Sequence, residues 1–439
     1  MNSSTSGDRA QERAVEPTGD HAVRRRTTCR LCNSPDVELV LALTPTPPVD
    51  AFVRADRLAE AQPSYPLDMF LCHACGHAQL LDVVSPEILF GSYFYETASS
   101  PGLVEHFRQY ADDLVRRMNP SAKSLVVDVG SNDGTLLRFF KARDLRVLGV
   151  DPAAAIARKA SASGVETKAA FFTLPVAQQI RQEHGPATIV TANNVFAHSD
   201  DLGEMAEAVR ALLADDGVFV FEVSYVLDMI NGMIFDLIYH EHLSYHSVKS
   251  LASFLRRHGL ELTDVLPNVS KGGSLRCIAQ LTGGPRPMAP AVASMIEHED
   301  AIGLDRPEIY REWAARIDVA SAKVGALVAE LRANGKTVAG YGASATATVL
   351  IYCFGLGEAI DFIVDDIPER QGRFSPGHHI PVVPAQALYN RDPDYVLILA
   401  WRFADMIVAK HQPYLDQGGR FIIPLPELRT LCASARPLT

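Results

Sequence analysis

The segment at residues 125–140, LVVDVGSNDGTLLRFF, most restricts what this chain can fold into. Its run of Val and Leu predicts a strand buried on both faces of a parallel sheet, and a glycine turn and a helical pattern follow. The turn carries Gly130 and Gly134, with Asp128 before them and Asp133 between them, so it lacks the three-glycine dinucleotide fingerprint. This acidic loop favours the cationic cofactor S-adenosylmethionine over a pyrophosphate. A dinucleotide site and a merely structural turn are the alternatives.

Further strand-like segments follow at residues 145–150, 187–192 and 217–223, with a helical run at 202–213. Alternating units of this kind predict a doubly wound α/β sheet, whose ligands lie at the carboxyl ends of the strands. Asp151 lies 21 residues beyond Gly130, about where an acid receives ribose hydroxyls, and the alternative is that it caps the next helix. The predicted cofactor residues are Asp128, Gly130, Asn132, Asp133, Gly134, Asp151, Asn193 and Asn194.

Four of the seven cysteines form two CxxC pairs, Cys29 with Cys32 and Cys72 with Cys75. A CxxC turn places two thiolates on one metal, and two such turns complete a tetrahedral zinc shell with no position left for a reacting water. We therefore expect a structural zinc. A neighbouring histidine in place of one cysteine, and a reduced redox pair, are the alternatives.

Composition restricts the partners and the compartment. The formal net charge of −11 disfavours a nucleic-acid or acidic-membrane surface. No apolar run approaches the roughly 18 residues that indicate a membrane span. Residues 1–27 are polar and lack the apolar core of a secretion signal, so we expect a disordered tail on a cytoplasmic protein. A multidomain chain with a small substrate is expected, and a monomer is favoured.

The string YHEHLSY at residues 239–245 places four titratable side chains in a row. The HExxH zinc motif is absent, and two histidines at HxH spacing could share a metal only on an extended backbone. Histidine titrates near neutral pH and a neighbouring carboxylate can orient it, so His242 beside Glu241 is a candidate general base. A solvated face is the alternative. His198 follows a predicted strand end, where cofactor and substrate meet.

The last two segments are predicted to be connecting strands and helices at residues 251–335 and a second Rossmann-like domain at 336–439. The glycine pair in NVSKGGSLR, residues 268–276, could bind phosphate through backbone amides or form a plain hairpin. The loop GASAT at 342–346 lacks a complete fingerprint, and could hold a dinucleotide, the nucleotide of the substrate or nothing. The predicted substrate-binding residues are Lys271, Gly272, Ser274, Arg276 and Ser344.

Several unrelated motifs occur in one order from about Cys29 to the end of the chain: the CxxC pairs, YFYETASS, VVDVGSNDG, NNVFAHSDD, FDLIYHEHLSY, GGSLR and GYGASAT. This order resembles the bacterial sugar C-methyltransferases of antibiotic deoxysugar pathways. The resemblance implies an α/β protein with a zinc-binding amino-terminal module at 28–90. It further implies a central Rossmann-like class I methyltransferase domain at 91–250, and a carboxyl-terminal Rossmann-like domain that helps hold a nucleotide-linked sugar.

The same resemblance implies His242 as general base, with Tyr93, His198, Tyr239 and Glu241 around the sugar. Lys271 departs from the pattern because we expect a histidine before GGS in relatives, and this bears on how the loop meets the substrate.

The activity implied by the resemblance is S-adenosylmethionine-dependent C-methylation of a dTDP-linked 4-keto-deoxysugar through an enolate. A hydrogen next to a ketone is acidic, so a base of near-neutral pKa can remove it while donors stabilise the oxygen. Carbon 3 is the favoured position, although the residues do not separate it from carbon 5. The alternatives are a sugar O-methyltransferase, an NAD-dependent nucleotide-sugar oxidoreductase and a zinc-tethered binding module without enzyme activity.

Overall fold

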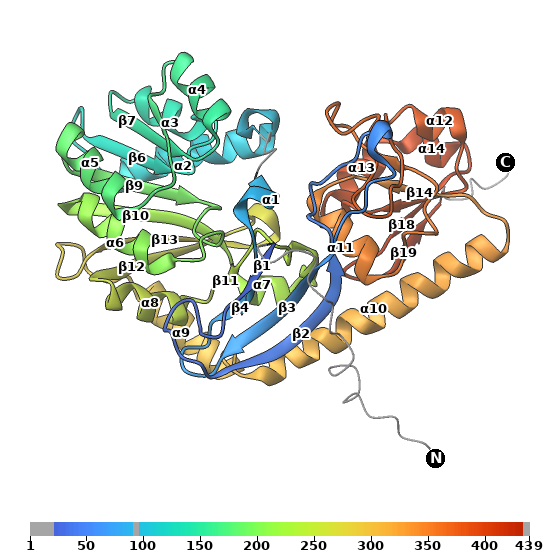
Figure 1. The fold of residues 1–439 in the computed structure, drawn as a ribbon, viewed down its shortest axis with the longest axis horizontal. Helices are drawn as coiled ribbons and strands as arrows, with labels where there is room; N and C mark the ends of the chain where they lie inside the picture. The colour runs from blue at the N-terminus through green and yellow to red at the C-terminus, as the bar shows by residue number, and fades with distance from the viewer. Residues whose placement is uncertain (1–21, 91–95, 433–439) are drawn as a thin grey trace, which may run out of the picture.

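The computed structural model describes residues 22–90 and 96–432, and the statements below concern these residues. Figure 1 shows the central domain and the carboxyl-terminal domain on either side of a small amino-terminal sheet. Two helices, α9 (Pro290–Ile302) and α10 (Pro307–Ala333), link the two larger domains, and α10 runs beneath the amino-terminal sheet and the carboxyl-terminal domain. Tyr310 and Trp313 on α10 are buried, so this predicted connector contributes to the core.

The amino-terminal module is built on an antiparallel sheet in the order β11-β4-β3-β2. Strands β2 (Val37–Thr46), β3 (Tyr65–Cys72) and β4 (Ala78–Leu80) come from the module itself. The fourth strand, β11 (Ser244–Tyr245), comes from the central part of the chain and pairs with β4. The module predicted at residues 28–90 therefore omits β11, because this strand lies more than 160 residues after β4 in the sequence.

The expected disordered tail ends earlier than residue 27. Val23–Arg25 form β1, which pairs antiparallel with β5 (Asp82–Val84). Arg25 forms an ion pair with Asp82, and Arg26 and Arg30 both pair with Asp200 at 3.1 Å. Arg25 and Arg26 thus attach this segment to the module and to the central domain.

The central sheet, within the described residues, has the order β12-β13-β10-β9-β6-β7-β8. Strands β6 (Leu125–Val129), β7 (Arg146–Asp151), β8 (Thr167–Ala169), β9 (Ala187–Asn193) and β10 (Leu213–Ser224) run parallel, as the sequence predicts. Strand β13 (Ser274–Leu281) is antiparallel to both β10 and β12 (Leu260–Asn268). The boundary predicted at residue 250 is therefore wrong, because the sheet continues to Leu281.

Helices cover both faces of this sheet. The pleat sends Val126 towards α2 (Pro101–Met118) and α3 (Thr135–Lys141), and Val127 towards the opposite core. The opposite face is covered by α5 (Leu174–His184), α6 (Leu202–Leu212) and α8 (Val248–Arg257), while α4 (Ala154–Ala162) follows β7. Side-chain caps fix two of these helix starts: Asp201 accepts from the Glu204 amide, and Ser247 accepts from the Ser250 amide.

The carboxyl-terminal domain contains a sheet in the order β16-β15-β14-β17-β18-β19 and confirms the predicted second Rossmann-like unit. Its strands are β14 (Val338–Tyr341), β15 (Ile363–Val364), β16 (Val382–Val383), β17 (Tyr395–Ile398), β18 (Arg420–Ile423) and β19 (Arg429–Leu431). Only β19 is antiparallel to its neighbour in this described sheet. The main helices are α11 (Ala345–Cys353), α12 (Ala387–Arg391), α13 (Ala404–Lys410) and α14 (Gln412–Asp416).

A buried carboxylate joins the central and carboxyl-terminal domains. Asp236, in the short helix η4 (Phe235–Leu237), is fully buried and accepts a hydrogen bond from the Trp401 indole at 2.9 Å. Its other oxygen accepts from Arg402 at 2.8 Å. Because a buried charge is tolerated only when it is paired and hydrogen-bonded, this contact fixes the position of one domain against the other.

Replacing Asp236 with Ala is expected to destabilise the protein by about 3 kcal/mol, because it leaves Arg402 and Trp401 without their partner. Chemical denaturation monitored by tryptophan fluorescence measures the change. Asp56→Ala serves as the control because that carboxylate forms an exposed ion pair with Arg54, and its removal should leave the midpoint unchanged. Equal midpoints for the two variants would contradict the proposed role of Asp236.

Candidate active site

The loop after β6 has the geometry that its glycines predict. Gly130 has φ +69°, and a Cβ added there would lie 2.2 Å from Cγ2 of Val195. Gly134 has φ +79°, and its Cβ would lie 2.9 Å from Cγ1 of Val165. Both positions combine a left-handed backbone with close packing, so only glycine fits.

Asp151 fixes this loop against the end of β7. One carboxylate oxygen accepts from the Asn132 amide and the other from the Ala153 amide, both at 2.9 Å. Burial raises the pKa of Asp151, although the two amide donors oppose this rise. A carboxylate held at this strand end is in the position from which an acid receives ribose hydroxyls.

The other three polar side chains of the predicted cofactor loop bind protein groups. Asp128 is buried and accepts from the Thr191 hydroxyl at 2.6 Å, and burial raises its pKa to about 7. Asn132 accepts from the Thr97 amide and Asp133 accepts from the Ala98 amide, both at 2.9 Å. These side chains hold the segment η3 (Thr97–Ser99) against the loop. Tyr93 lies outside the described residues.

Replacing Gly130 with Ala is expected to weaken binding of S-adenosylhomocysteine at least about tenfold, because the new methyl group displaces Val195 and distorts the loop. Isothermal titration calorimetry measures the affinity. Gly164→Ala is the matched control: Gly164 also has positive φ, but its Cβ would meet only the Lys141 ammonium at 3.7 Å. Equal losses of affinity in both variants would show that backbone strain, and not the loop, causes the effect.

The string at residues 239–245 forms a loop after η4 and ends in the two residues of β11. His242 is buried, and its Nδ1 lies 2.7 Å from the carbonyl oxygen of Leu237. A carbonyl can only accept, so Nδ1 carries the proton and Nε2 keeps its lone pair. Burial, His198 and Lys271 lower the pKa of His242 well below the usual value, which keeps the imidazole neutral and able to act as a base.

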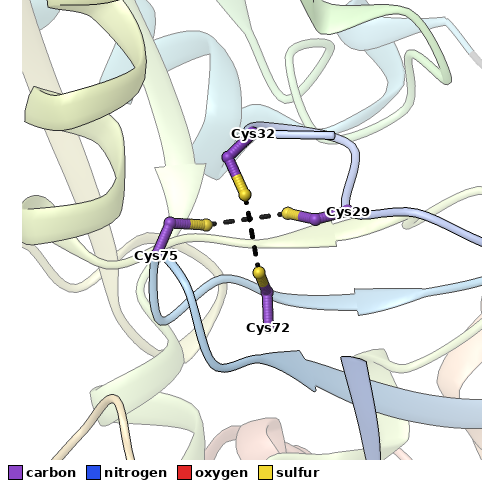
Figure 2. Close-up of side chains that lie close together, drawn as sticks. All are labelled: Cys29, Cys32, Cys72 and Cys75. Carbon is purple, nitrogen blue, oxygen red and sulfur yellow. Dashed lines mark hydrogen bonds between the residues drawn. The ribbon is translucent and has the colours of Figure 1, made fainter. Parts of the chain in front are cut away.

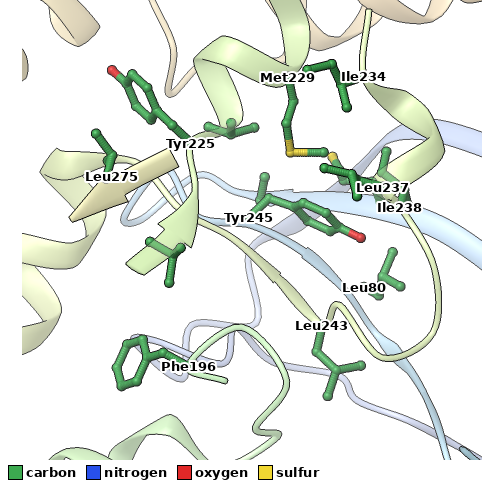
Figure 3. Packing of buried hydrophobic residues seen from close by; sticks show 14 of the residues in the cluster. Leu80, Phe196, Tyr225, Met229, Ile234, Leu237, Ile238, Leu243, Tyr245 and Leu275 are labelled. Atoms are coloured by element: carbon green, nitrogen blue, oxygen red, sulfur yellow. The ribbon is translucent and has the colours of Figure 1, made fainter. Parts of the chain in front are cut away.

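His242 lines a small pocket with polar and apolar sides. Figure 3 shows part of the apolar side, where Tyr245 lies among Met229, Leu237 and Leu243. The ring centroids of His198 and His242 are 5.0 Å apart, and those of Tyr239 and His242 are 4.0 Å apart. The pocket is lined by Asn194, Ala197, His198, Val223, Ser224, Met229, Leu237, His242, Ser244, Tyr245 and Lys271. The structure therefore brings His198, His242, Lys271 and Asn194 together.

The amino-terminal module holds this loop in place. Strand β11 pairs with β4, and the Leu80 amide donates to the Leu243 carbonyl at 3.0 Å. The Leu243 amide donates to the Ala197 carbonyl at 2.9 Å, which connects the loop of His242 to that of His198. The buried Arg30 also donates to the Leu243 carbonyl at 3.0 Å. The position of His242 thus depends on the segment that contains the CxxC pairs.

The four predicted zinc ligands converge at one point, as Figure 2 shows. The Cys29 and Cys75 sulfurs are 3.6 Å apart, the Cys32 and Cys72 sulfurs are 3.5 Å apart, and all four lie within 4.8 Å of one another. Four sulfurs at about 2.3 Å from a tetrahedral zinc would be about 3.8 Å apart, so the site fits the metal. Hydrogen bonds from Cys72 and Cys75 lower the pKa of Cys29, which favours a thiolate there.

Glu241 has a different environment from the one its sequence position suggests. Among the described residues it forms no hydrogen bond with His242, which is oriented by the Leu237 carbonyl. Burial and the nearby Asp50 raise the pKa of Glu241 to about 8. Nε2 of His240 lies 3.2 Å from the carbonyl oxygen of Tyr65, so this histidine packs into the amino-terminal module. The consecutive titratable residues therefore face different parts of the protein.

The predicted substrate residues are also divided. Lys271 lines the pocket, whereas Arg276 donates to the buried Glu222 at 2.8 Å and stacks on Tyr110. Ser274 donates to the Ser270 carbonyl at 2.9 Å, and Gly272 has φ +90° in the turn between β12 and β13. Arg276 and Ser274 therefore stabilise the sheet edge. His106, which binds Glu222 at 2.7 Å, was not predicted, because a histidine on an amphipathic helix carries no motif.

The carboxyl-terminal domain repeats the acid and glycine geometry of the cofactor loop. Asp365, at the end of β15, accepts from the Ala343 amide at 2.6 Å and from the Ile367 amide at 2.7 Å. The preceding Gly342 has φ +96°. Ser344, a predicted substrate residue, lies 3.0 Å from the Thr346 hydroxyl at the start of α11. The sequence shows the glycines but not this hydrogen-bonded pairing.

Family models of methyltransferases match three consecutive parts of the chain. A zinc binding domain matches residues 29–90, a methyltransferase domain matches 103–265, and a C-methyltransferase C-terminal domain matches 269–426. The chain belongs to the C-methyltransferases, and its methyl donor is S-adenosylmethionine. It is 37% identical to C-methyltransferase NovU of Streptomyces niveus over 414 residues, which are 94% of this chain and 99% of that protein. Of the activities considered from the sequence, C-methyl transfer is the one these relatives support.

Solved structures are similar to part of the chain. PH0226 protein from Pyrococcus horikoshii is 13% identical with a TM-score of 0.36, covering 44% of this chain and 97% of that one. A 1,6-didemethyltoxoflavin-N1-methyltransferase from Burkholderia thailandensis is 20% identical with a TM-score of 0.30, covering 40% and 77%. The family assignment does not rest on them.

Within residues 22–90 and 96–432, none of the helices has both the length and the apolar character needed to cross a membrane.

Proposed function

We propose that this protein methylates carbon 3 of a dTDP-linked 4-keto-deoxysugar, using S-adenosylmethionine, in antibiotic deoxysugar biosynthesis. The observation that carries the proposal is His242: its Nδ1–H donates to the Leu237 carbonyl, which leaves the lone pair of Nε2 free to accept a proton in a residue that lines a pocket. A C-methyltransferase needs such a base because carbon becomes a nucleophile only after it loses a proton. The relation to C-methyltransferase NovU supports methyl transfer to carbon. The motif resemblance supports a deoxysugar of an antibiotic pathway as the acceptor.

In the proposed reaction, His242 Nε2 removes the proton from the carbon next to the ketone. Donors around the pocket, His198 or Tyr239, stabilise the oxygen on which charge develops. When bound, S-adenosylmethionine supplies an electrophilic methyl group. The loop at residues 130–134 and Asp151 would hold it, with Asn193 and Asn194 at the neighbouring strand end. The zinc has no part in the chemistry, because four cysteines fill its coordination shell.

Three further predicted site residues are given roles in the proposal. Glu241 is proposed to hold a sugar hydroxyl, since its raised pKa makes it a possible donor near neutral pH. Ser344 and the carboxyl-terminal loop are proposed to hold the nucleotide portion. Tyr93 is proposed to contact the sugar on the basis of the resemblance alone.

Incubation with S-adenosylmethionine and a panel of dTDP-4-keto-deoxysugars tests the proposal. NMR of the products locates the new methyl group, and we expect it at carbon 3 of at least one panel member. Methylation of a hydroxyl, or the absence of any product across the panel, would overturn the proposal.

A further inference from the structure

The turn between β12 and β13 places a cation at the proposed acceptor pocket. Lys271 lies in the short helix η5 (Ser270–Gly272) with φ +52° and lines the same pocket as His198 and His242. The two glycines that follow it are closely packed, since a Cβ on Gly272 would lie 2.5 Å from Ile234, and one on Gly273 would lie 2.3 Å from Asp228. The turn is thus fixed against the elements that precede the His242 loop.

The charge of Lys271 has no close anionic partner in the part of the chain that the structure describes. Among the described residues no carboxylate forms an ion pair with it, whereas the nearby Arg402 pairs with Asp236, and Arg276 pairs with Glu222. Lys271 is an exposed residue by surface area, but the protein atoms around its ammonium desolvate it. Desolvation is the largest cause that lowers the pKa of Lys271 to about 8, and the charge of Arg402 adds to it, while the charge of Glu222 opposes this change.

The charge of Lys271 contributes to lowering the pKa values of both pocket histidines. Burial and Lys271 lower the pKa of His198 to about 3, and burial, His198 and Lys271 lower the pKa of His242 well below the usual value. The Nε2 of His198 is buried and has no hydrogen-bond partner among the described residues. The pocket is therefore lined by a lysine and two neutral imidazoles, one of which carries the unpaired Nε2, and this set suits an oxygen that gains negative charge.

We propose that Lys271 is a catalytic residue whose ammonium binds the ketone oxygen of the substrate and stabilises the enolate formed by His242. The inference rests on the proposed function. When the C–H bond breaks, its proton goes to His242 Nε2 and the negative charge moves to the oxygen facing Lys271. When the carbon attacks, the sulfonium–methyl bond breaks with its electron pair left on sulfur, and the ketone forms again.

Replacing Lys271 with Met tests this role. We expect solvent-deuterium exchange at the reacting carbon, without methyl donor, to fall about a hundredfold, with affinity for S-adenosylhomocysteine unchanged. The probe is the panel ketosugar that the wild-type protein methylates. In a plot of exchange rate against pH, the fall in rate at low pH should move to higher pH, because loss of a nearby cation raises the pKa of His242. In Lys271→Arg, which keeps the positive charge, the rate should fall at the same pH as in the wild-type protein.

Lys249→Met is the matched control, since Lys249 pairs with Asp300 and Asp305 on the surface of the same domain, and its exchange should equal that of the wild type. If Lys271→Met does not fold, as judged by circular dichroism, Lys271→Gln replaces it. Wild-type exchange with only a raised KM in the Lys271 variant would overturn the inference and leave the proposed function standing. Absence of exchange in the wild-type protein with every ketosugar would overturn both.

Discussion

Replacing His242 with alanine is expected to lower methyl transfer about a thousandfold and to abolish detectable deuterium exchange at the acceptor carbon. A positioned general base typically contributes 10²–10⁴-fold to a rate, and His242 is positioned by its hydrogen bond to the Leu237 carbonyl. His242 is not among the residues proposed to hold the methyl donor, so S-adenosylhomocysteine should bind the variant with unchanged affinity. NMR of the ketosugar in deuterated buffer measures exchange directly.

His240→Gln is the control for this experiment. His240 is equally buried and lies two residues away, but it faces the Tyr65 carbonyl and is not among the pocket residues. Glutamine can donate to the same carbonyl, so exchange should remain near the wild-type rate per folded molecule. Undiminished exchange in the His242 variant would assign the base to another residue, and equal losses in both variants would point to distortion of the loop.

Loss of the zinc ligands is the second large effect that the structure predicts. Cys72→Ser should remove the metal and lower methyl transfer at least about a hundredfold, although the zinc does not take part in the reaction. Structural Cys₄ sites contribute to folding directly, with apparent binding free energies of about 10–16 kcal/mol in zinc-finger peptides. The effect reaches the chemistry because β4, which follows Cys75, pairs with β11, which follows His242.

Metal content by mass spectrometry, methyl transfer and S-adenosylhomocysteine affinity distinguish this explanation from a catalytic metal. We expect the variant to lose zinc and turnover while the central domain still binds S-adenosylhomocysteine. Cys432→Ser is the matched control, because Cys432 is exposed and is not among the four clustered cysteines. Full activity in a zinc-free Cys72→Ser protein would contradict the structural coupling.

The sequence predicts best those features that depend on neighbouring residues. The Val and Leu run before Gly130 predicts β6, and the CxxC spacing predicts the four-sulfur site, because each signal is contained within a few residues. The second Rossmann-like domain is predicted for the same reason. His242 and His198, which the motif resemblance places around one substrate, line one pocket in the structure.

Features that depend on distant pairing are less accessible from the sequence. The methyltransferase sheet extends beyond residue 250 because β13 pairs with β10, and β11 joins the sheet of another module. Local order also does not show which way a side chain turns: Asn132 and Asp133 bind the backbone near Thr97, and the Leu237 carbonyl orients His242.

The pairing of β11 with β4 also has a consequence for the order of folding. Cys29 to Cys75 are synthesised early, but the edge of their sheet is completed by Ser244 and Tyr245, more than 160 residues later. Contacts between such distant segments form slowly because a long loop must first close. A nascent chain would therefore expose the edge of β4 until the central domain emerges from the ribosome. Zinc binding at this stage would restrict the conformations of the amino-terminal module before β11 is available.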